Sequence, residues 1–106
     1  MAKFLFQISY TSQAVQAILK EGSSVRQART RQILEGMGGK LESYYLAFGE
    51  TDLYIIAELP DRETAAAVAF YTSSSGAINV KTTVLLTSAE VDQAAEKAAN
   101  FQMPGE

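Results

Sequence analysis

Apolar residues alternate with polar ones in four stretches of the chain, and they recur at helical spacing in four others. The alternation predicts β-strands at residues 3–10, 40–48, 52–59 and 78–86. The helical spacing predicts helices at residues 13–20, 25–37, 62–76 and 87–99. Gly22 lies between the first two helices, so we expect the first connection to be a broken or bent helix.

The predicted elements follow the order βαββαβ, with one extra helix at the C-terminal end. This order is typical of the ferredoxin-like α+β fold, in which a four-stranded antiparallel sheet carries two crossover helices on one face. A chain of 106 residues fits one domain with one hydrophobic core. We expect that domain to span residues 1–100 and residues 101–106 to form a flexible tail.

The two faces of the predicted sheet differ in character. The helix-covered face should be uniformly apolar, with Phe4, Phe6, Ile8, Leu53, Ile55, Ala57, Leu59, Val80, Val84 and Leu86. The other face mixes apolar and polar side chains, namely Leu5, Gln7, Ser9, Glu42, Tyr44, Leu46, Phe48, Asp52, Tyr54, Ile56, Glu58, Asn79, Lys81, Thr83 and Leu85.

The mixed face is too apolar for a soluble monomer to leave open to water. We expect a second copy of the chain to cover it, in a homodimer packed sheet to sheet about a twofold axis. The alternative is a monomer in which the C-terminal helix folds back over its own sheet.

Composition removes several classes of function. The chain has no Cys and no His, which excludes disulfides, thiolate nucleophiles, imidazole bases and the Ser-His-Asp triad. We therefore expect no metal and no cofactor. A net charge of -3 argues against nucleic-acid binding. The absence of a long apolar run and of an export signal favours a cytoplasmic protein with no membrane partner.

Glu50 and Asp52 occupy the tip of the predicted central hairpin, in the segment AFGETDLY at residues 47–54. Gly, Thr and Asp are ordinary turn residues, so the tip has a sufficient structural explanation. The functional interpretation makes Glu50 and Asp52 a carboxylate pair beside Tyr44, Tyr45 and Tyr54. Such a pair could act as general base and acid or bind a hard cation, and without His a carboxylate is the expected base.

Three cations are candidates for ligand binding. Lys81 should point onto the mixed face, either as a clamp for a substrate anion or as the partner of an acidic side chain across the dimer, Glu42, Glu58 or Asp52. Arg26 and Arg29 lie one helical turn apart and form a small basic patch with Lys20. That patch is either a solvated helix face or a site for a carboxylate or phosphate.

Three segments resemble the GYD-domain proteins, a small bacterial family within the dimeric α/β-barrel group. They are MAKFLFQISYTSQ at the start of the chain, GGKLESYYLAFGETDLYII at residues 38–56 and GAINVKTTVLLTSAEVDQA at residues 76–94. The resemblance implies the ferredoxin-like fold and the dimer, but it implies no activity. Gly49 and Asp52 match the Gly-Tyr-Asp signature, whereas Thr51 stands in place of its Tyr.

Two functions from different classes follow from the residues. The first is a small-molecule-binding dimer that acts as a sensor or accessory protein, with its pocket between sheet and helices or at the twofold axis. The second is a cofactor-independent enzyme of the monooxygenase, isomerase or lyase type. It would act on a small aromatic or carbonyl compound, with Asp52 or Glu50 as base and a tyrosine orienting the substrate.

Overall fold

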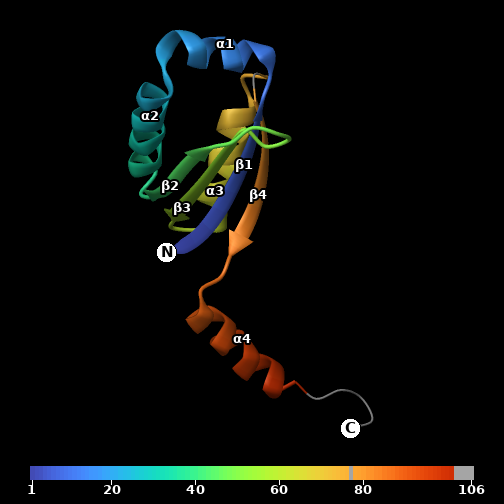
Figure 1. The fold of residues 1–106 in the computed structure, drawn as a ribbon. Helices are drawn as coiled ribbons and strands as arrows, with labels where there is room; N and C mark the ends of the chain where they lie inside the picture. Colours follow the sequence, from blue (N-terminus) through green and yellow to red (C-terminus); the bar gives the residue numbers. More distant parts are fainter. Residues whose placement is uncertain (77, 102–106) are drawn as a thin grey trace.

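The structure is a computed structural model, and it describes residues 1–76 and 78–101. The elements in chain order are β1 (Ala2–Tyr10), α1 (Ser12–Glu21), α2 (Ser23–Gly36), β2 (Lys40–Leu46), β3 (Leu53–Leu59), α3 (Arg62–Ser73), β4 (Ile78–Leu85) and α4 (Ser88–Ala99). The order confirms the predicted α+β ferredoxin-like fold with an added C-terminal helix (Figure 1). The tail predicted at residues 101–106 lies, apart from Phe101, outside the described residues.

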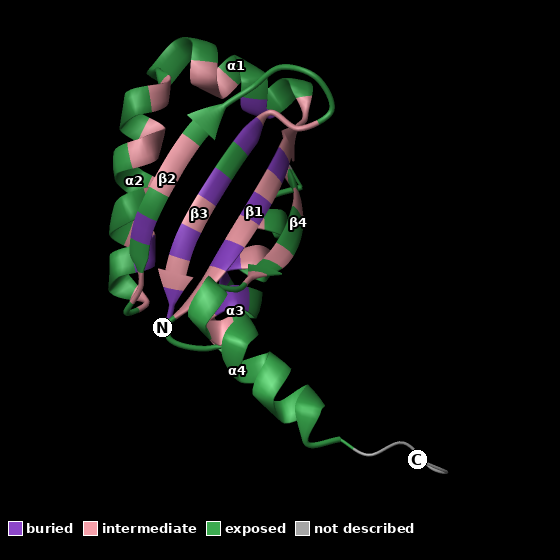
Figure 2. Ribbon diagram, turned by 60° about the horizontal axis from the view of Figure 1, so that its bottom comes forward, coloured by how far each residue is buried: buried purple, intermediate pink, exposed green. Residues whose placement is uncertain are grey.

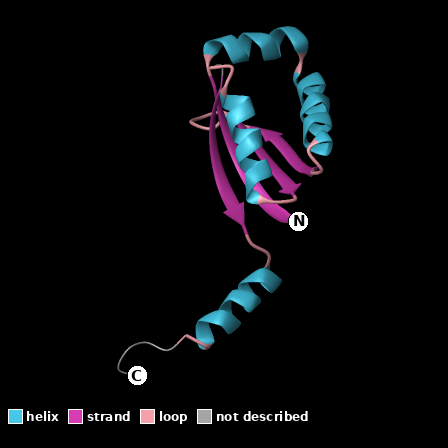
Figure 3. Cartoon of the chain, turned by 180° about the vertical axis from the view of Figure 1, so that it is seen from behind, coloured by secondary structure: helices cyan, strands magenta, loops and turns pink. Residues whose placement is uncertain are grey.

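The four strands form one antiparallel sheet in the order β2-β3-β1-β4. Helices α2 and α3 pack on one face of this sheet, and Figure 3 shows α3 lying across the sheet on that side. We call the face they cover the helix-covered face and the opposite one the open face. Helices α1 and α2 are separate, with Gly22 between them, as predicted.

Polar side chains fix three of the helix starts. The Thr11 hydroxyl accepts a hydrogen bond from the first turn of α1 at 3.4 Å, and the Asp61 carboxylate accepts one from the first turn of α3 at 2.8 Å. Thr87 and Glu90 form a capping box at the start of α4, with bonds of 3.2 and 2.9 Å. Each cap satisfies backbone N–H groups that the helix itself leaves without a partner.

The core lies between the helix-covered face and the helices. Figure 2 shows buried positions alternating with less buried ones along β1 and β3. The buried strand residues match the predicted apolar set on these two strands: Phe4, Phe6, Ile8, Leu53, Ile55, Ala57 and Leu59. Leu34 of α2 and Ala65 and Val68 of α3 are buried against them.

Strand β2 departs from strict alternation. The pairing of β2 with β3 shifts between Leu41 and Ser43, where Glu42 is an extra residue on β2. Such a β-bulge turns every following side chain to the opposite face. Tyr44 therefore lies opposite Ile55, a residue of the helix-covered face.

The prediction placed Tyr44, Leu46 and Phe48 on the mixed face, which is the open face of the structure. It is wrong for Tyr44 and Leu46 because of the bulge, and it is wrong for Phe48 because β2 ends before this residue. Tyr44 and Leu46 lie on the helix-covered side, and Tyr45 takes the place on the open face. Phe48 follows the end of β2 and is fully exposed in the loop that leads to β3.

The end of β4 also differs from the prediction. Val84 lies opposite Phe4 on the helix-covered side, as expected, but more than half of its surface is exposed. Leu86 was expected on the same face, yet it lies beyond the end of β4 and is exposed. Because β4 is an edge strand, its last residues have a neighbouring strand on one side only.

Helix α4 extends away from the sheet (Figure 1), and none of its residues is buried. It does not fold back over its own sheet, which was the arrangement expected of a monomer. No helix or further strand within residues 1–76 and 78–101 consequently covers the open face. Each helix in this part of the chain is too short or too polar to cross a membrane.

Gly39 should tolerate no side chain. A Cβ atom there would lie 2.6 Å from both the Glu58 carbonyl oxygen and Leu59 Cδ2. We expect Gly39→Ala to lower the free energy of unfolding by about 1–3 kcal/mol, because the backbone must shift to relieve the clash. Urea unfolding followed by circular dichroism measures this change.

Gly36→Ala is the matched control, since a Cβ at the end of α2 meets nothing within 4 Å. Alanine is the better helix former, so this variant should be unchanged or more stable by up to about 1 kcal/mol. Equal destabilisation by the two substitutions would show that close packing at Gly39 is not the cause.

Candidate functional site

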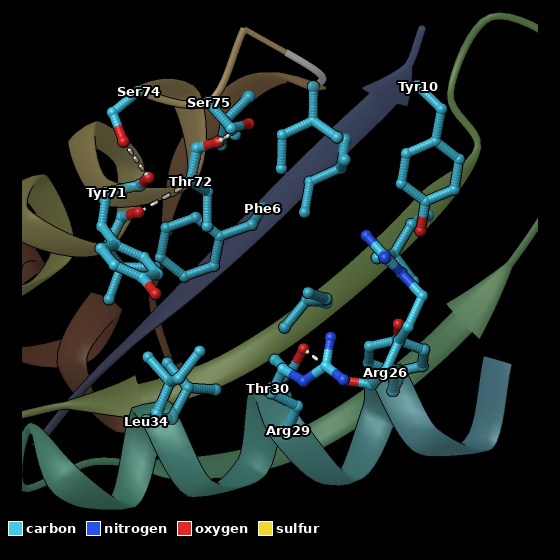
Figure 4. A pocket seen from close by; sticks show the side chains of 18 residues that line it. Phe6, Tyr10, Arg26, Arg29, Thr30, Leu34, Tyr71, Thr72, Ser74 and Ser75 are labelled. Atoms are coloured by element: carbon cyan, nitrogen blue, oxygen red, sulfur yellow. Dashed lines mark hydrogen bonds between the residues drawn. The ribbon is translucent and has the colours of Figure 1, made fainter. Parts of the chain in front are cut away.

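A cavity of about 450 Å³ lies between the helix-covered face of the sheet and helices α2 and α3 (Figure 4). Phe6 and Ile8 of β1 and Ile55 of β3 form part of its apolar wall. Leu34 of α2 and Val68 of α3 contribute to the wall from the helices. Concave and mostly apolar spaces of this size are typical of sites for small molecules.

The helices supply a polar end to this cavity. Arg26, Thr30 and Leu34 are spaced four residues apart on α2, so all three point toward the cavity. Val68 and Thr72 have the same spacing on α3. Helix α2 begins, and α3 ends, near the C-terminal end of β1 (Figure 1). Both helices therefore become more polar toward the same end of the sheet.

Tyr10 and Tyr44 bring two hydroxyl groups to the cavity. Burial raises the pKa of Tyr10 to about 12; Tyr44 adds to the rise and the charge of Arg26 opposes it. Burial also raises the pKa of Tyr44, again against the effect of Arg26. Tyr10 and Arg26 lie at the same end of the cavity in Figure 4. Both hydroxyls are therefore neutral hydrogen-bond donors at physiological pH.

Glu21, the last residue of α1, pairs with both arginines of the cavity. Arg29 donates from Nη2 to Glu21 Oε1 at 2.7 Å, whereas Arg26 Nη1 lies 3.6 Å from Glu21 Oε2. The hydrogen bond from Arg29 lowers the pKa of Glu21. The shorter contact ties Glu21 mainly to Arg29 and leaves Arg26 the more weakly paired of the two.

The described lining residues of the cavity include arginines, tyrosines and the hydroxyl groups of Thr and Ser, but no Asp, Glu or Lys. Such a set can donate hydrogen bonds and attract negative charge. It offers no carboxylate to act as a base. Across residues 1–76 and 78–101, no three acidic side chains gather closely enough to hold a metal ion.

Asp52 lies outside this cavity and bonds to the backbone. Its Oδ2 accepts a hydrogen bond from the Tyr10 N–H at 2.8 Å, and its own N–H donates to the Ile8 carbonyl at 2.9 Å. Glu50 is exposed, and its backbone carbonyl accepts a bond from the Ser9 hydroxyl at 2.8 Å. The hairpin tip is thereby tied to the end of β1. A catalytic role for Glu50 or Asp52 stays a prediction.

Tyr54 and Lys81 lie on the open face, where both are exposed and both stand opposite Gln7 in the sheet. Lys81 borders a smaller hollow of about 300 Å³ on that face, together with Glu50. Glu42, one of the acidic partners predicted for Lys81 across the dimer, pairs with Lys3 of its own chain at 3.1 Å, and the role of Lys81 stays a prediction.

The structure therefore divides the candidate residues into two groups. The cavity brings together Tyr44, Arg26 and Arg29. The hairpin tip and the open face hold Glu50, Asp52, Tyr54 and Lys81.

Sequence reasoning missed Tyr10 and Thr30 as members of the site. Tyr10 extends the apolar row of alternate residues on β1 and is the one member with a hydroxyl group, which is a usable signal. Thr30 lies midway between Arg26 and Leu34 on one stripe of α2. A polar residue within such a stripe indicates either a solvated edge or a polar cavity, and only the packing of the helix separates the two.

The family model of the GYD domain matches residues 4–95. The chain belongs to the GYD-domain family. This confirms the resemblance noted in its sequence, including the segments at the start, at the hairpin and around β4. Searches of curated proteins and of solved structures found no match.

In this GYD domain the hairpin tip has a well-defined structural role. Gly49 has a φ of 135°, in the region that glycine adopts more readily than other residues. The Thr51 hydroxyl lies 3.5 Å from Gln7 Oε1, and the carboxylate of Asp52 bonds to Tyr10 as described above. Gly49 thus shapes the loop, and Thr51 and Asp52 fix it to β1.

The ionisation of Tyr10 should contribute to the loss of stability of this GYD domain at alkaline pH. Folding raises the pKa of Tyr10 from 10.0 to about 12, so its contribution to stability is complete below pH 10 and is lost as the pH rises toward 12. We expect Tyr10→Phe to remove the last phase of tyrosine ionisation, measured by absorbance at alkaline pH. It should also lessen the loss of stability over the same range.

Tyr45→Phe is the control, because Tyr45 is exposed on the open face away from the cavity. This variant should keep the high-pH phase. Persistence of that phase in Tyr10→Phe would contradict the assignment to Tyr10.

Proposed function

We propose that this GYD domain binds a small, largely apolar molecule in the cavity between α2, α3 and the sheet, as a sensor or accessory protein. We further propose that it does so as a homodimer joined through the open faces of two sheets. The observation that carries the first part is the cavity of about 450 Å³ itself, with its apolar wall and its polar end.

The chemistry of the cavity supports binding over catalysis. A catalytic base needs to lie within hydrogen-bond reach of the substrate proton that it removes. The described residues that line the cavity include no carboxylate, while Tyr10 and Tyr44 have a raised pKa and hold their protons. The enzyme alternative, with Asp52 or Glu50 as base, gains no support from this cavity.

The open face supports the homodimer. Leu5, Ile56 and Leu85 lie on this face together with Tyr45 and Tyr54, without cover from the described chain. A second copy would remove this apolar surface from water.

The charges of the open face fit a second copy as well. Lys3 and Lys81 share the face with Glu42 and Glu58, so it carries both signs of charge. A twofold contact places the same surface on both sides. A face with charges of both signs can therefore match acidic to basic side chains against itself.

The cavity can be tested with N-phenyl-1-naphthylamine, an uncharged dye whose fluorescence rises in apolar surroundings. We expect the native protein to bind this dye and Val68→Phe to bind it about tenfold or more weakly, since the ring would occupy the cavity. Ala67→Phe adds the same ring to the exposed side of α3 and should bind as the native protein does. Absence of dye binding to the native protein would overturn the proposed function.

The homodimer can be tested with Tyr54→Lys, which places a charge in the middle of the open face. We expect native mass spectrometry to show two chains in the native protein and mainly one chain in this variant, because the charge would be buried without a partner. Phe70→Lys makes the same change at an exposed position of α3 and should remain a dimer. A native protein that is monomeric at micromolar concentration would rule out the proposed contact.

A further inference from the structure

We propose that the ligand of the cavity is a monocarboxylate with an apolar body, and that Arg26 and the hydroxyls of Tyr10 and Tyr44 hold its carboxylate group. This inference rests on the proposed function, because it assigns a chemical class to the occupant of the same cavity. It goes further by specifying the charge, the number of charged groups and the orientation of that occupant.

The sign of the charge follows from the lining of the cavity. Arg26 and Arg29 both line it, and the described lining residues bring no negative charge against them. The nearest paired carboxylate, Glu21, lies outside the lining and holds Arg29 more closely than Arg26. The lining of the cavity thus carries cationic groups and no anionic one, which favours an anion over a cationic molecule.

The number of charges follows from the pairing of the two arginines. Arg29 is held by Glu21 at 2.7 Å and its side chain is 53% exposed. Arg26 is held at 3.6 Å and its side chain is only 25% exposed. One guanidinium group therefore remains weakly paired and partly shielded from water, which suits a single carboxylate better than a dianionic phosphate.

The orientation of the ligand follows from the two hydroxyl groups. Tyr10 lies at the same end of the cavity as Arg26 (Figure 4), and the charge of Arg26 acts on the hydroxyl groups of both Tyr10 and Tyr44. As neutral phenols they can donate hydrogen bonds to a carboxylate oxygen. The opposite part of the cavity is walled by Phe6, Leu34 and Val68, which suit a hydrocarbon or aromatic body. The carboxylate should thus lie at the Tyr10 end and the apolar body between α3 and the sheet.

Octanoate and 1-octanol separate this inference from the proposed function, because they share an apolar chain and differ in the charged group. Isothermal titration calorimetry at pH 7.5 should show octanoate binding about tenfold or more tightly than 1-octanol, the amount expected of one charge-assisted hydrogen-bonded contact. Arg26→Gln should lose this preference and keep its affinity for 1-octanol. Arg31→Gln, at an exposed position of the same helix, should keep both affinities.

Three further variants test the roles of single groups. Tyr10→Phe and Tyr44→Phe should each weaken octanoate several-fold and leave 1-octanol unchanged, because each removes one donor. Glu21→Gln should strengthen octanoate, since the competing carboxylate is gone. If Arg26→Gln is unfolded by circular dichroism, Arg26→Lys keeps the charge without the planar fork, and it should weaken octanoate while binding 1-octanol normally.

The outcomes distinguish the two proposals. Binding of 1-octanol and octanoate with equal affinity, or an octanoate preference that survives in Arg26→Gln, would overturn the carboxylate assignment and leave the apolar binding site standing. Tighter binding of octyl phosphate than of octanoate would also overturn it. If neither octanoate nor 1-octanol binds the native protein, the proposed function fails and the ligand assignment fails with it.

Discussion

The β-bulge at Glu42 is the constraint on which the cavity depends. Leu41 and Tyr44 are three residues apart, and an unbroken strand would place them on opposite faces of the sheet. The bulge brings both to the helix-covered side, where Leu41 is buried and Tyr44 joins the cavity. The ion pair between Glu42 and Lys3 is partly exposed and contributes less than about 1 kcal/mol. The burial of Leu41 therefore does more than this ion pair to hold the bulge in place.

The cavity exists because the side chains that α2 and α3 present to the sheet change from apolar to polar along each helix. Toward one end of the sheet, α2 presents Leu34 and α3 presents Ala65, and these pack closely against the strands. Toward the other end, the corresponding positions on the same stripes are Thr30 and Thr72, whose side chains are short and polar. Protein interiors are normally filled to the density of organic crystals. Larger apolar residues at these two positions could have closed the space, so its opening follows from the choice of side chains.

Hydrophobic periodicity alone is sufficient to predict the order of the elements, the topology and the buried residues of β1 and β3. It succeeds there because both are central strands with one fully covered face, which gives a strict period of two. It fails in β2, because a single extra residue moves every following side chain to the other face of the sheet, and the hydrophobic pattern does not reveal that residue. Arg26 and Arg29 could be found from their spacing on a helix, but the position of Arg26 at the Tyr10 end of the cavity depends on how α2 packs, which local sequence does not specify.

The hairpin tip with Glu50 and Asp52 does not line the cavity, but it is hydrogen-bonded to the end of β1, from which Tyr10 enters the cavity. Ser9 and Tyr10 are consecutive, so their side chains point to opposite faces of the sheet, and the loop bonds to both residues. Ser9 donates its hydroxyl to the Glu50 carbonyl, and the Tyr10 N–H donates to the Asp52 carboxylate. A partly buried backbone N–H that loses a charged acceptor loses a strong hydrogen bond, and water replaces that bond only in part. The Asp52 carboxylate therefore helps to hold the strand end from which the Tyr10 ring enters the cavity, and the position of the Tyr10 hydroxyl depends on a residue that does not line the cavity itself.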